Sequence, residues 1–282
     1  MMASPNLSYC ANLMRQFDND RFLCSLFAPV AERDALAAIG AFNIEVARIR
    51  EQVREPLLGH MRLRWWADVF DGVWAGTPGR HPVALALAEA VGRFGLDKRP
   101  FDRLLQARAR DLDDAAPASL TALLDYAEAT SASLAEAGLR VLAAEDEETK
   151  AAGRDVAIAW ALLGLLRAIP FHARTRRIYL PADMSRQTGL DPDRLFDKGL
   201  TDGLRPVVEK LVEIAVEHLR RARSRRKAVQ RAALPVLLPA RLADLWVDRL
   251  RSAEFNPFDG RVQAPAPWRM LHLTTARLRA RF

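Results

Sequence analysis

The chain has 282 residues, half of them hydrophobic, and it carries a formal net charge of +7. This length and apolar content suffice for one large domain with a substantial core, and two cysteines, Cys10 and Cys24, are too few for a disulfide-rich secreted protein. The longest apolar run, residues 156–166, is shorter than the roughly 18 residues that a membrane-spanning helix needs, which excludes such a helix and predicts a buried one.

The opening segment MMASPNLSYC lacks the basic start and apolar core of a signal peptide, and Asp18 and Asp20 disfavour a transit peptide. We therefore expect a cytoplasmic protein. Peripheral attachment at the inner membrane, on the matrix side in a eukaryote, stays open. The two cysteines are expected to be buried free thiols rather than metal ligands, because no other soft ligands stand beside them.

Apolar residues recur with the helical period along most of the chain, and strand-type alternation is almost absent. This periodicity predicts helices over residues 5–17, 31–53, 57–75, 81–94, 100–112, 119–143, 147–171, 203–230 and 237–253. Prolines stand near several of these proposed ends, and Ser119 can cap the helix that begins there. The sequence therefore predicts an all-α bundle, with residues 1–282 forming a single domain.

Two acidic pairs on these helices have the spacing of cation ligands. Asp68 and Asp71, like Asp111 and Asp114, are three residues apart and could share an ion. Such spacing is also common on solvated helix faces, and this is the interpretation we favour.

Four aromatic side chains in the region of residues 65–74 recur at helical spacing, namely Trp65, Trp66, Phe70 and Trp74. The spacing predicts core packing. The alternative is that these rings line a long apolar cavity.

Basic residues concentrate in three segments, 174–177, 218–231 and 276–282. Nucleic acid is not an expected partner, because no recognised nucleic-acid motif is present and aromatic residues do not alternate with the arginines. A basic helical face beside apolar residues suits an anionic phospholipid surface, and a solvated helix face explains it equally well.

The most informative motif lies in LGLLRAIPFHARTRRIYLPADM, residues 163–184. It resembles the second signature of the squalene/phytoene synthase family, LRDVxxDxxxGRxYLP, at Leu166, Arg167, Arg177, Tyr179, Leu180 and Pro181. The two aspartates of that pattern fall on Ala168 and His172. The segment ALAAIGAFNIEVARIREQV, residues 35–53, resembles the first signature, whose DxxxD positions fall on Ala47 and Glu51. Of four expected carboxylates, only Glu51 remains.

In active family members these carboxylates share Mg²⁺ ions, which bridge to the substrate diphosphate and neutralise its leaving charge. Ala168 offers no ligand, and the imidazole of His172 is a poor ligand for a hard cation. The resemblance therefore implies an isoprenoid synthase fold, a helical bundle around a central apolar cavity, with no Mg²⁺ or other cofactor and no assignable catalytic residue.

Further blocks, such as YCANLMRQFDNDRFLCSLFAP and MRLRWWADVFDGVWAG, extend the resemblance over most of residues 8–280. Together with the metal-free motifs, they resemble the subfamily of the mitochondrial complex I assembly factor. That resemblance implies a catalytically inactive protein that assembles a respiratory NADH:quinone oxidoreductase, with complex I subunits or assembly intermediates as partners. A prenyl diphosphate transferase that uses Glu51 is the competing hypothesis, and a lipid-binding module is the third.

Several basic side chains remain beside the lost carboxylates. Guanidinium groups can hold phosphate bidentately without a metal. We therefore hypothesise that the remnant pocket binds an anionic lipid headgroup, a prenyl diphosphate or a quinone tail without reacting it. The candidate ligand-binding residues are Arg48, Arg167, Arg174, Arg177 and Tyr179.

Overall fold

The computed structural model describes residues 8–53, 55–279 and 282, and all regular secondary structure in this part of the chain is helical, as the sequence predicts. The helices are α1 (Tyr9–Phe17), α2 (Asn19–Ser25), α3 (Val30–Ala47), α4 (Ile49–Gln52), α5 (Pro56–Trp74), α6 (Pro82–Phe94), α7 (Arg99–Arg108), α8 (Leu120–Ala127), α9 (Ser133–Val141), α10 (Glu147–Arg167), α11 (Ile169–Arg174), α12 (Ala182–Thr188), α13 (Pro192–Lys198), α14 (Leu204–Ser224), α15 (Leu234–Leu237), α16 (Pro239–Ser252), α17 (Gly260–Gln263) and α18 (Arg269–Leu278). Two 3₁₀ turns cover Ala109–Leu112 and Arg231–Ala233, and a π-helical turn, Glu128–Ala132, joins α8 to α9.

The long predicted helices are present, but several are shorter or broken. The predicted helix 31–53 is divided at Arg48, 147–171 is divided at Ala168, and 119–143 contains the π-helical turn. The predicted helix 203–230 already ends at Ser224. Positions 1–7, which include the start of the predicted helix 5–17 and most of the opening segment, lie outside the described residues. The helices α2, α12, α13, α15, α17 and α18 were not predicted.

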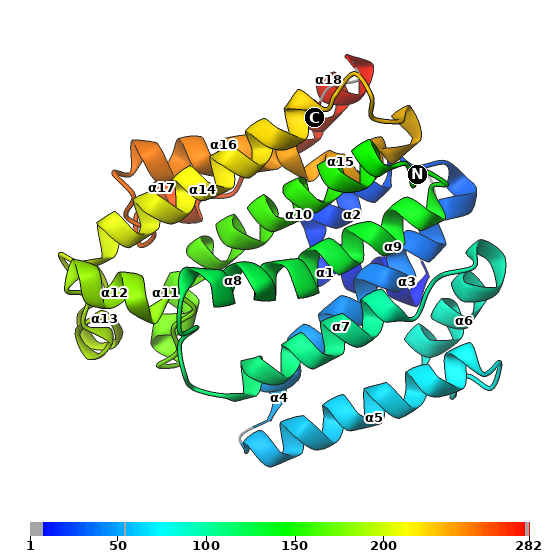
Figure 1. The fold of residues 1–282 in the computed structure, drawn as a ribbon, viewed down its shortest axis with the longest axis horizontal. Helices are drawn as coiled ribbons and strands as arrows, with labels where there is room; N and C mark the ends of the chain where they lie inside the picture. Colours follow the sequence, from blue (N-terminus) through cyan, green and yellow to red (C-terminus); the bar gives the residue numbers. More distant parts are fainter. Residues whose placement is uncertain (1–7, 54, 280–281) are drawn as a thin grey trace, which may run out of the picture.

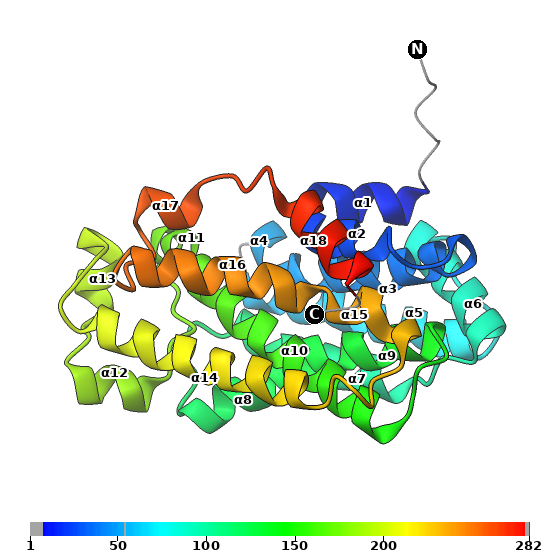
Figure 2. The same ribbon diagram turned by 90° about the horizontal axis from the view of Figure 1, so that it is seen from above.

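The bundle is organised around α10, which runs through the middle of the molecule (Figure 1). Helices α14 and α16 lie on one side of it, α8, α9 and α7 lie on the other, and α5 forms the far edge (Figure 1). In the turned view, α1 and α2 lie on one face of the bundle beside α18 (Figure 2). The apolar run on α10 is buried, with Leu162, Leu163 and Leu166 almost without solvent exposure. The run is therefore a core helix, as predicted, and no helix in the described ranges is long and apolar enough to cross a membrane.

A second part of the core lies between α3, α5, α6 and α7, where aromatic rings pack edge to face or tilted against one another. The ring of Phe42 lies 4.5 Å from that of Phe70 and 5.7 Å from that of Phe101, measured between centroids. Trp66 and Phe70 are buried as predicted, whereas Trp65 is 47% exposed, so the core prediction was wrong for that residue. Trp65 is exposed because its side chain lies on the solvent side of α5, whereas that of Trp66 lies on the core side.

The two cysteines are buried and free, as predicted. Cys10 lies on α1 and Cys24 on α2, and neither forms a disulfide. Burial raises the pKa of both thiols, that of Cys10 to about 11. Both therefore act as packing groups near neutral pH.

Candidate functional site

The two degenerate motifs lie where long core helices break. On the first, α3 ends at Ala47 and α4 starts at Ile49, and Arg48 forms the junction. On the second, α10 ends at Arg167 and α11 starts at Ile169. Pro170 is the second residue of α11, and proline is tolerated in the first turn because the N–H groups there have no acceptor within the helix. Each break lies at a former metal-ligand position of the family pattern or directly beside one, since α3 ends at Ala47 and Ala168 stands between α10 and α11.

At the first motif, Glu51 is the remaining carboxylate, and it lies on the surface. Its Oε2 atom is 3.4 Å from Nε of Arg48, and about two fifths of the Glu51 side chain is exposed. The Arg48 guanidinium in turn lies over the ring of Phe17, 3.7 Å from the ring centroid. Glu51 is thus already neutralised by a neighbouring arginine.

At the second motif, the positions one helical turn apart on α10 and α11 are Gly164, Ala168 and His172, and none of them carries a carboxylate. A Cβ added to Gly164 would meet no atom within 4 Å, so this position borders open space. His172 packs against Tyr179 with the rings tilted by 43° and 4.6 Å between centroids, and its buried Nδ1 has no hydrogen-bond partner. Burial, with a contribution from the positive charge of Arg177, lowers the pKa of His172 to about 4. The imidazole is therefore neutral near pH 7.

These residues do not fit the Mg²⁺ ions that the family uses. A magnesium cluster needs several oxygen ligands, and the two motifs supply one carboxylate that is paired with arginine and one neutral imidazole. Among the described residues, no group of three or more histidine, cysteine, aspartate or glutamate side chains is placed to hold a metal ion.

Arg177 and Tyr179, two predicted ligand-binding residues, converge on Asp111. Tyr179 donates its hydroxyl to Oδ1 of Asp111 at 3.1 Å, and Arg177 donates to the Asp111 backbone carbonyl. Tyr126 donates to the same Oδ1 at 2.8 Å, and Arg108 donates to Oδ2 at 3.0 Å. We call these five residues the Asp111 cluster. Its hydrogen bonds connect the end of α7 and the turn after it, helix α8, and the segment between α11 and α12.

The Asp111 cluster shows what the acidic pairs do. Asp111 is buried and accepts hydrogen bonds, whereas Asp114 is exposed and pairs with Arg50 at 3.1 Å, so the two do not share an ion site. Asp68 and Asp71 are likewise exposed and pair with arginine and lysine, as expected for a solvated helix face. Asn43 of α3 accepts a hydrogen bond from Arg108 at 3.0 Å and links the cluster to the first motif.

Arg167, another predicted ligand-binding residue, belongs to a second polar group around Asp20 of α2. The Oδ2 atom of Asp20 lies 3.7 Å from Nη1 of Arg167, and its Oδ1 atom pairs with Arg269 of α18. The guanidinium of Arg167 lies 3.4 Å above the ring of Trp246, and that of Arg249 lies 4.8 Å from the same ring.

We call Asp20, Arg167, Arg249 and Arg269 the Asp20 cluster. Asp20 pairs with two of the arginines, Arg167 and Arg269, and the third, Arg249, lies near the same Trp246 ring as Arg167. Burial, together with the charges of Arg269 and Arg249, lowers the pKa of Arg167 to about 10. The cluster thus carries an excess of positive charge in a partly buried place, which favours the binding of an anion.

The predicted ligand-binding residues are therefore distributed over separate places. Arg177 and Tyr179 lie together in the Asp111 cluster, Arg167 lies in the Asp20 cluster, and Arg48 lies at the α3–α4 junction. Arg174 is exposed at the end of α11. Asp20, Arg108, Tyr126 and Arg269 were missed. For Asp20, the signal was its place in the block YCANLMRQFDNDRFLCSLFAP, which resembles the family.

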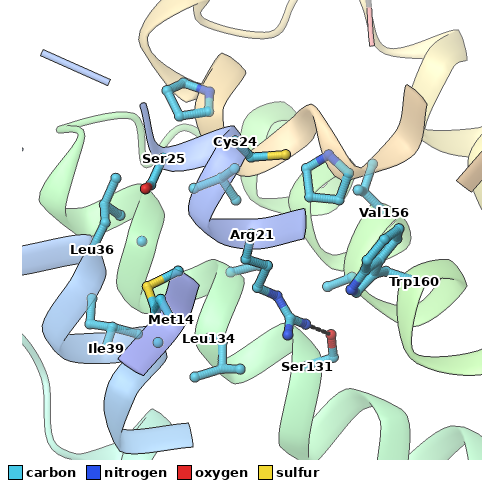
Figure 3. A pocket seen from close by; sticks show the side chains of 17 residues that line it. Met14, Arg21, Cys24, Ser25, Leu36, Ile39, Ser131, Leu134, Val156 and Trp160 are labelled. Carbon is cyan, nitrogen blue, oxygen red and sulfur yellow. Dashed lines mark hydrogen bonds between the residues drawn. The ribbon is translucent and has the colours of Figure 1, made fainter. Parts of the chain in front are cut away.

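A small apolar cavity lies between α1, α2, α3, α9 and α10 (Figure 3). Its volume is about 90 Å³, far below the roughly 300–1,000 Å³ of a typical ligand pocket. Met14 fills the space over Gly40, where an added Cβ would lie 2.5 Å from the Met14 Sδ. Figure 3 shows the Arg21 side chain directed across the cavity to Ser131 in the π-helical turn, with 3.1 Å between Nη2 and Oγ. In this conformation the cavity has no room for a prenyl chain.

Comparison with known proteins points to the same family as the two motifs. A sequence model of the squalene/phytoene synthase family matches residues 14–271. The chain is 31% identical over 261 residues to NADH dehydrogenase (ubiquinone) complex I, assembly factor 6 from Bos taurus, which covers 93% of this chain and 78% of the relative. It is 27% identical over 303 residues to a phytoene synthase from Arthrospira platensis, covering 99% and 94% of the two chains.

A solved structure of a dehydrosqualene synthase in complex with ligand is similar to this chain in fold. The TM-score is 0.83 at 18% sequence identity, and the match covers 96% of this chain and 95% of the other. The all-α isoprenoid synthase fold that the motifs implied is thus confirmed.

Proposed function

The chain belongs to the squalene/phytoene synthase family, and from this premise we propose that it is a catalytically inactive member that acts in the assembly of respiratory complex I. Its partners are subunits or assembly intermediates of that complex. It acts from the cytoplasmic side of the inner membrane, or from the matrix side in a eukaryote. The names of the relatives support the assembly role.

One observation carries the proposal of inactivity. Where the family pattern has four carboxylates, this chain has only Glu51, which lies on the surface and pairs with Arg48 at 3.4 Å. A prenyl synthase needs charge neutralisation where the diphosphate leaves, and a single carboxylate paired with arginine cannot hold the metal ions that provide it.

A ligand that is held without reaction is compatible with this role. The Asp20 cluster has three guanidinium groups and one carboxylate, which suits a phosphate-bearing headgroup or a prenyl diphosphate. A bound prenyl chain would require Met14 and Arg21 to move, because both occupy the cavity between α2 and α9. The inferred ligand therefore binds with its charged group at the Asp20 cluster.

The assembly role is tested by deleting the gene in the source organism. We expect less assembled NADH:quinone oxidoreductase in the membranes, measured by native gel electrophoresis and by NADH:quinone activity. A plasmid copy of the wild type should restore both, and so should Glu51→Ala, because this carboxylate has no catalytic task in the proposal. Normal complex I in the deletion strain would contradict the assembly role.

The competing transferase is tested on the purified protein. We expect no diphosphate release from labelled farnesyl or geranylgeranyl diphosphate with Mg²⁺. Saturable binding without turnover, weakened by Arg167→Gln, would support the ligand site. Release that disappears in Glu51→Ala would instead identify a prenyl diphosphate transferase and would end the proposal of inactivity.

A further inference from the structure

Helix α18 exposes an apolar ridge on the outside of the molecule. Its inner face, with Leu273 and Ala276, is buried against α16. Leu271 and Leu278, which are two helical turns apart and therefore on the same side, are 59% and 81% exposed. Trp268, just before the helix, is 69% exposed. No described part of the chain covers this ridge.

Basic residues surround the ridge, and acidic residues are absent from this part of the sequence. After Asp259 the chain contains no aspartate or glutamate. Arg277 and Arg279 are exposed on the two sides of the ridge, and neither pairs with a carboxylate among the described residues. The exposed face of α18 is thus apolar in the middle and positive at its borders.

The positive surface continues from α18 onto α14 and α16. A hollow beside α18 is lined by Arg223, Arg226, Arg241 and Arg279, and its one acidic side chain is that of Asp244; the main-chain oxygen of Phe282 also accepts from Arg223. Two of these arginines, Arg223 and Arg241, both bond to Asp244 at 2.8 Å. Because four of the side chains that line the hollow are arginines and one is acidic, this surface is positive.

We propose that the outer face of α18 docks the protein onto the surface of an anionic phospholipid membrane. Leucine and tryptophan side chains enter the boundary between headgroups and acyl chains, and the flanking arginines contact the phosphate groups. This is the arrangement of an interfacial helix that lies in the membrane plane. It gives the basic segments 218–231 and 276–282 a common partner.

A second apolar surface, on α5, provides an internal comparison. Leu57, Leu58, Met61 and Trp65 are exposed there at 46–67%. This stripe continues toward acidic residues, because Asp68 and Asp71 are exposed on the same helix and pair with Arg64 and Lys98. It therefore lacks the charge excess of α18. The two helices also lie at opposite edges of the molecule, so a flat membrane cannot contact both (Figure 1).

The test is flotation of the full chain with vesicles of phosphatidylcholine, with and without about 30% phosphatidylglycerol. We expect binding only to the anionic vesicles, weakened by added salt. The double variants Leu271→Glu/Leu278→Glu and Arg277→Glu/Arg279→Glu should each weaken binding roughly tenfold or more. The matched control is Leu58→Glu/Met61→Glu on α5, which should bind as the wild type does.

All these substitutions fall on exposed side chains, so the variants should fold, and circular dichroism checks this. The proposal is overturned if the wild type binds both kinds of vesicle equally or binds neither. It is also overturned if an α18 variant keeps full binding, or if the α5 variant loses as much as the α18 variants. The assay needs no complex I, so it succeeds or fails independently of the assembly role.

Discussion

The Asp111 and Asp20 clusters are both built on a buried aspartate, and they differ in their balance of charge. In the Asp111 cluster, the carboxylate accepts from Tyr126, Tyr179 and Arg108, so nearly all its capacity is used by neutral hydroxyls and one arginine. In the Asp20 cluster, the carboxylate pairs only with guanidinium groups, those of Arg167 and Arg269, and a third arginine, Arg249, lies nearby.

This difference separates a place that holds the fold together from a place that suits an anion. The Asp111 cluster is complete in itself, and it ties the segment after α11 to the turn after α7 by hydrogen bonds between residues far apart in sequence. The Asp20 cluster has more guanidinium groups than its single carboxylate can neutralise. We therefore expect the first to govern stability and the second to govern binding, and each prediction below tests one side of this distinction.

The largest effect is expected for Asp111→Ala. The change leaves the buried charge of Arg108 without its carboxylate and leaves two buried hydroxyls without an acceptor. Removing one partner of a buried ion pair typically costs about 3–5 kcal/mol of unfolding free energy. Urea unfolding followed by circular dichroism measures it. Asp114→Ala, three residues on and exposed, should change the free energy by less than about 0.5 kcal/mol. Equal losses in the two variants would refute the structural role of the cluster.

For the Asp20 cluster, we expect Asp20→Asn to destabilise the protein by about 2 kcal/mol, because its arginine partners lose their common counter-ion but stay partly solvated. Added inorganic phosphate should then stabilise this variant more than the wild type, since an anion that binds only the folded state raises its stability. Thermal unfolding with and without phosphate measures the difference. In the control Arg269→Gln, which removes one guanidinium group of the cluster, the stabilisation by added phosphate should be smaller. Identical phosphate effects in all three proteins would show that the cluster binds no anion.

The protonation of His172 should give the unfolding free energy a pH dependence that comes from the Asp111 cluster and not from the Asp20 cluster. The ring packs on Tyr179 in the Asp111 cluster, and its pKa is lowered from 6.5 to about 4. As pH falls from 6.5 to about 4, the unfolded chain takes up a proton that the folded chain does not. The unfolding free energy therefore decreases over this window, by about 1 kcal/mol after allowance for a partly exposed ring. In His172→Gln this part of the pH dependence should disappear, and an unchanged slope would show that the ring is freely solvated.

Much of the fold could be predicted because the long helices have strong apolar periodicity. The core helix α10 and the outer helix α5 were found in this way. The short helices α2, α13 and α17 have too few residues for a periodic signal. Their N-caps, Asp18, Asp191 and Asp259, were readable in the sequence, but an aspartate marks turns as often as helix starts.

The site was predictable only where a motif was contiguous. Arg177 and Tyr179 belong to one short pattern, and the structure brings them together. Their common partner Asp111 is more than 60 residues away along the chain, and a local pattern cannot pair residues at that distance. The pairing of Asp20 with Arg269, which spans almost the whole chain, is hidden for the same reason. Contacts of this kind depend on how the helices pack, which periodicity does not specify.

The smallest effect is expected at the residue that the transferase hypothesis needs most. Glu51 is exposed and pairs only with Arg48, which already lies over Phe17. Because exposed ion pairs contribute little, Glu51→Ala should change the unfolding free energy by less than about 0.5 kcal/mol. Isothermal titration with Mg²⁺ should give the same absence of binding in the variant and the wild type, since one arginine-paired carboxylate is a poor magnesium site. Magnesium binding by the wild type that is lost in Glu51→Ala would mean that the first motif still gathers a metal, and the contrast between a retained scaffold and a lost cofactor site would no longer hold.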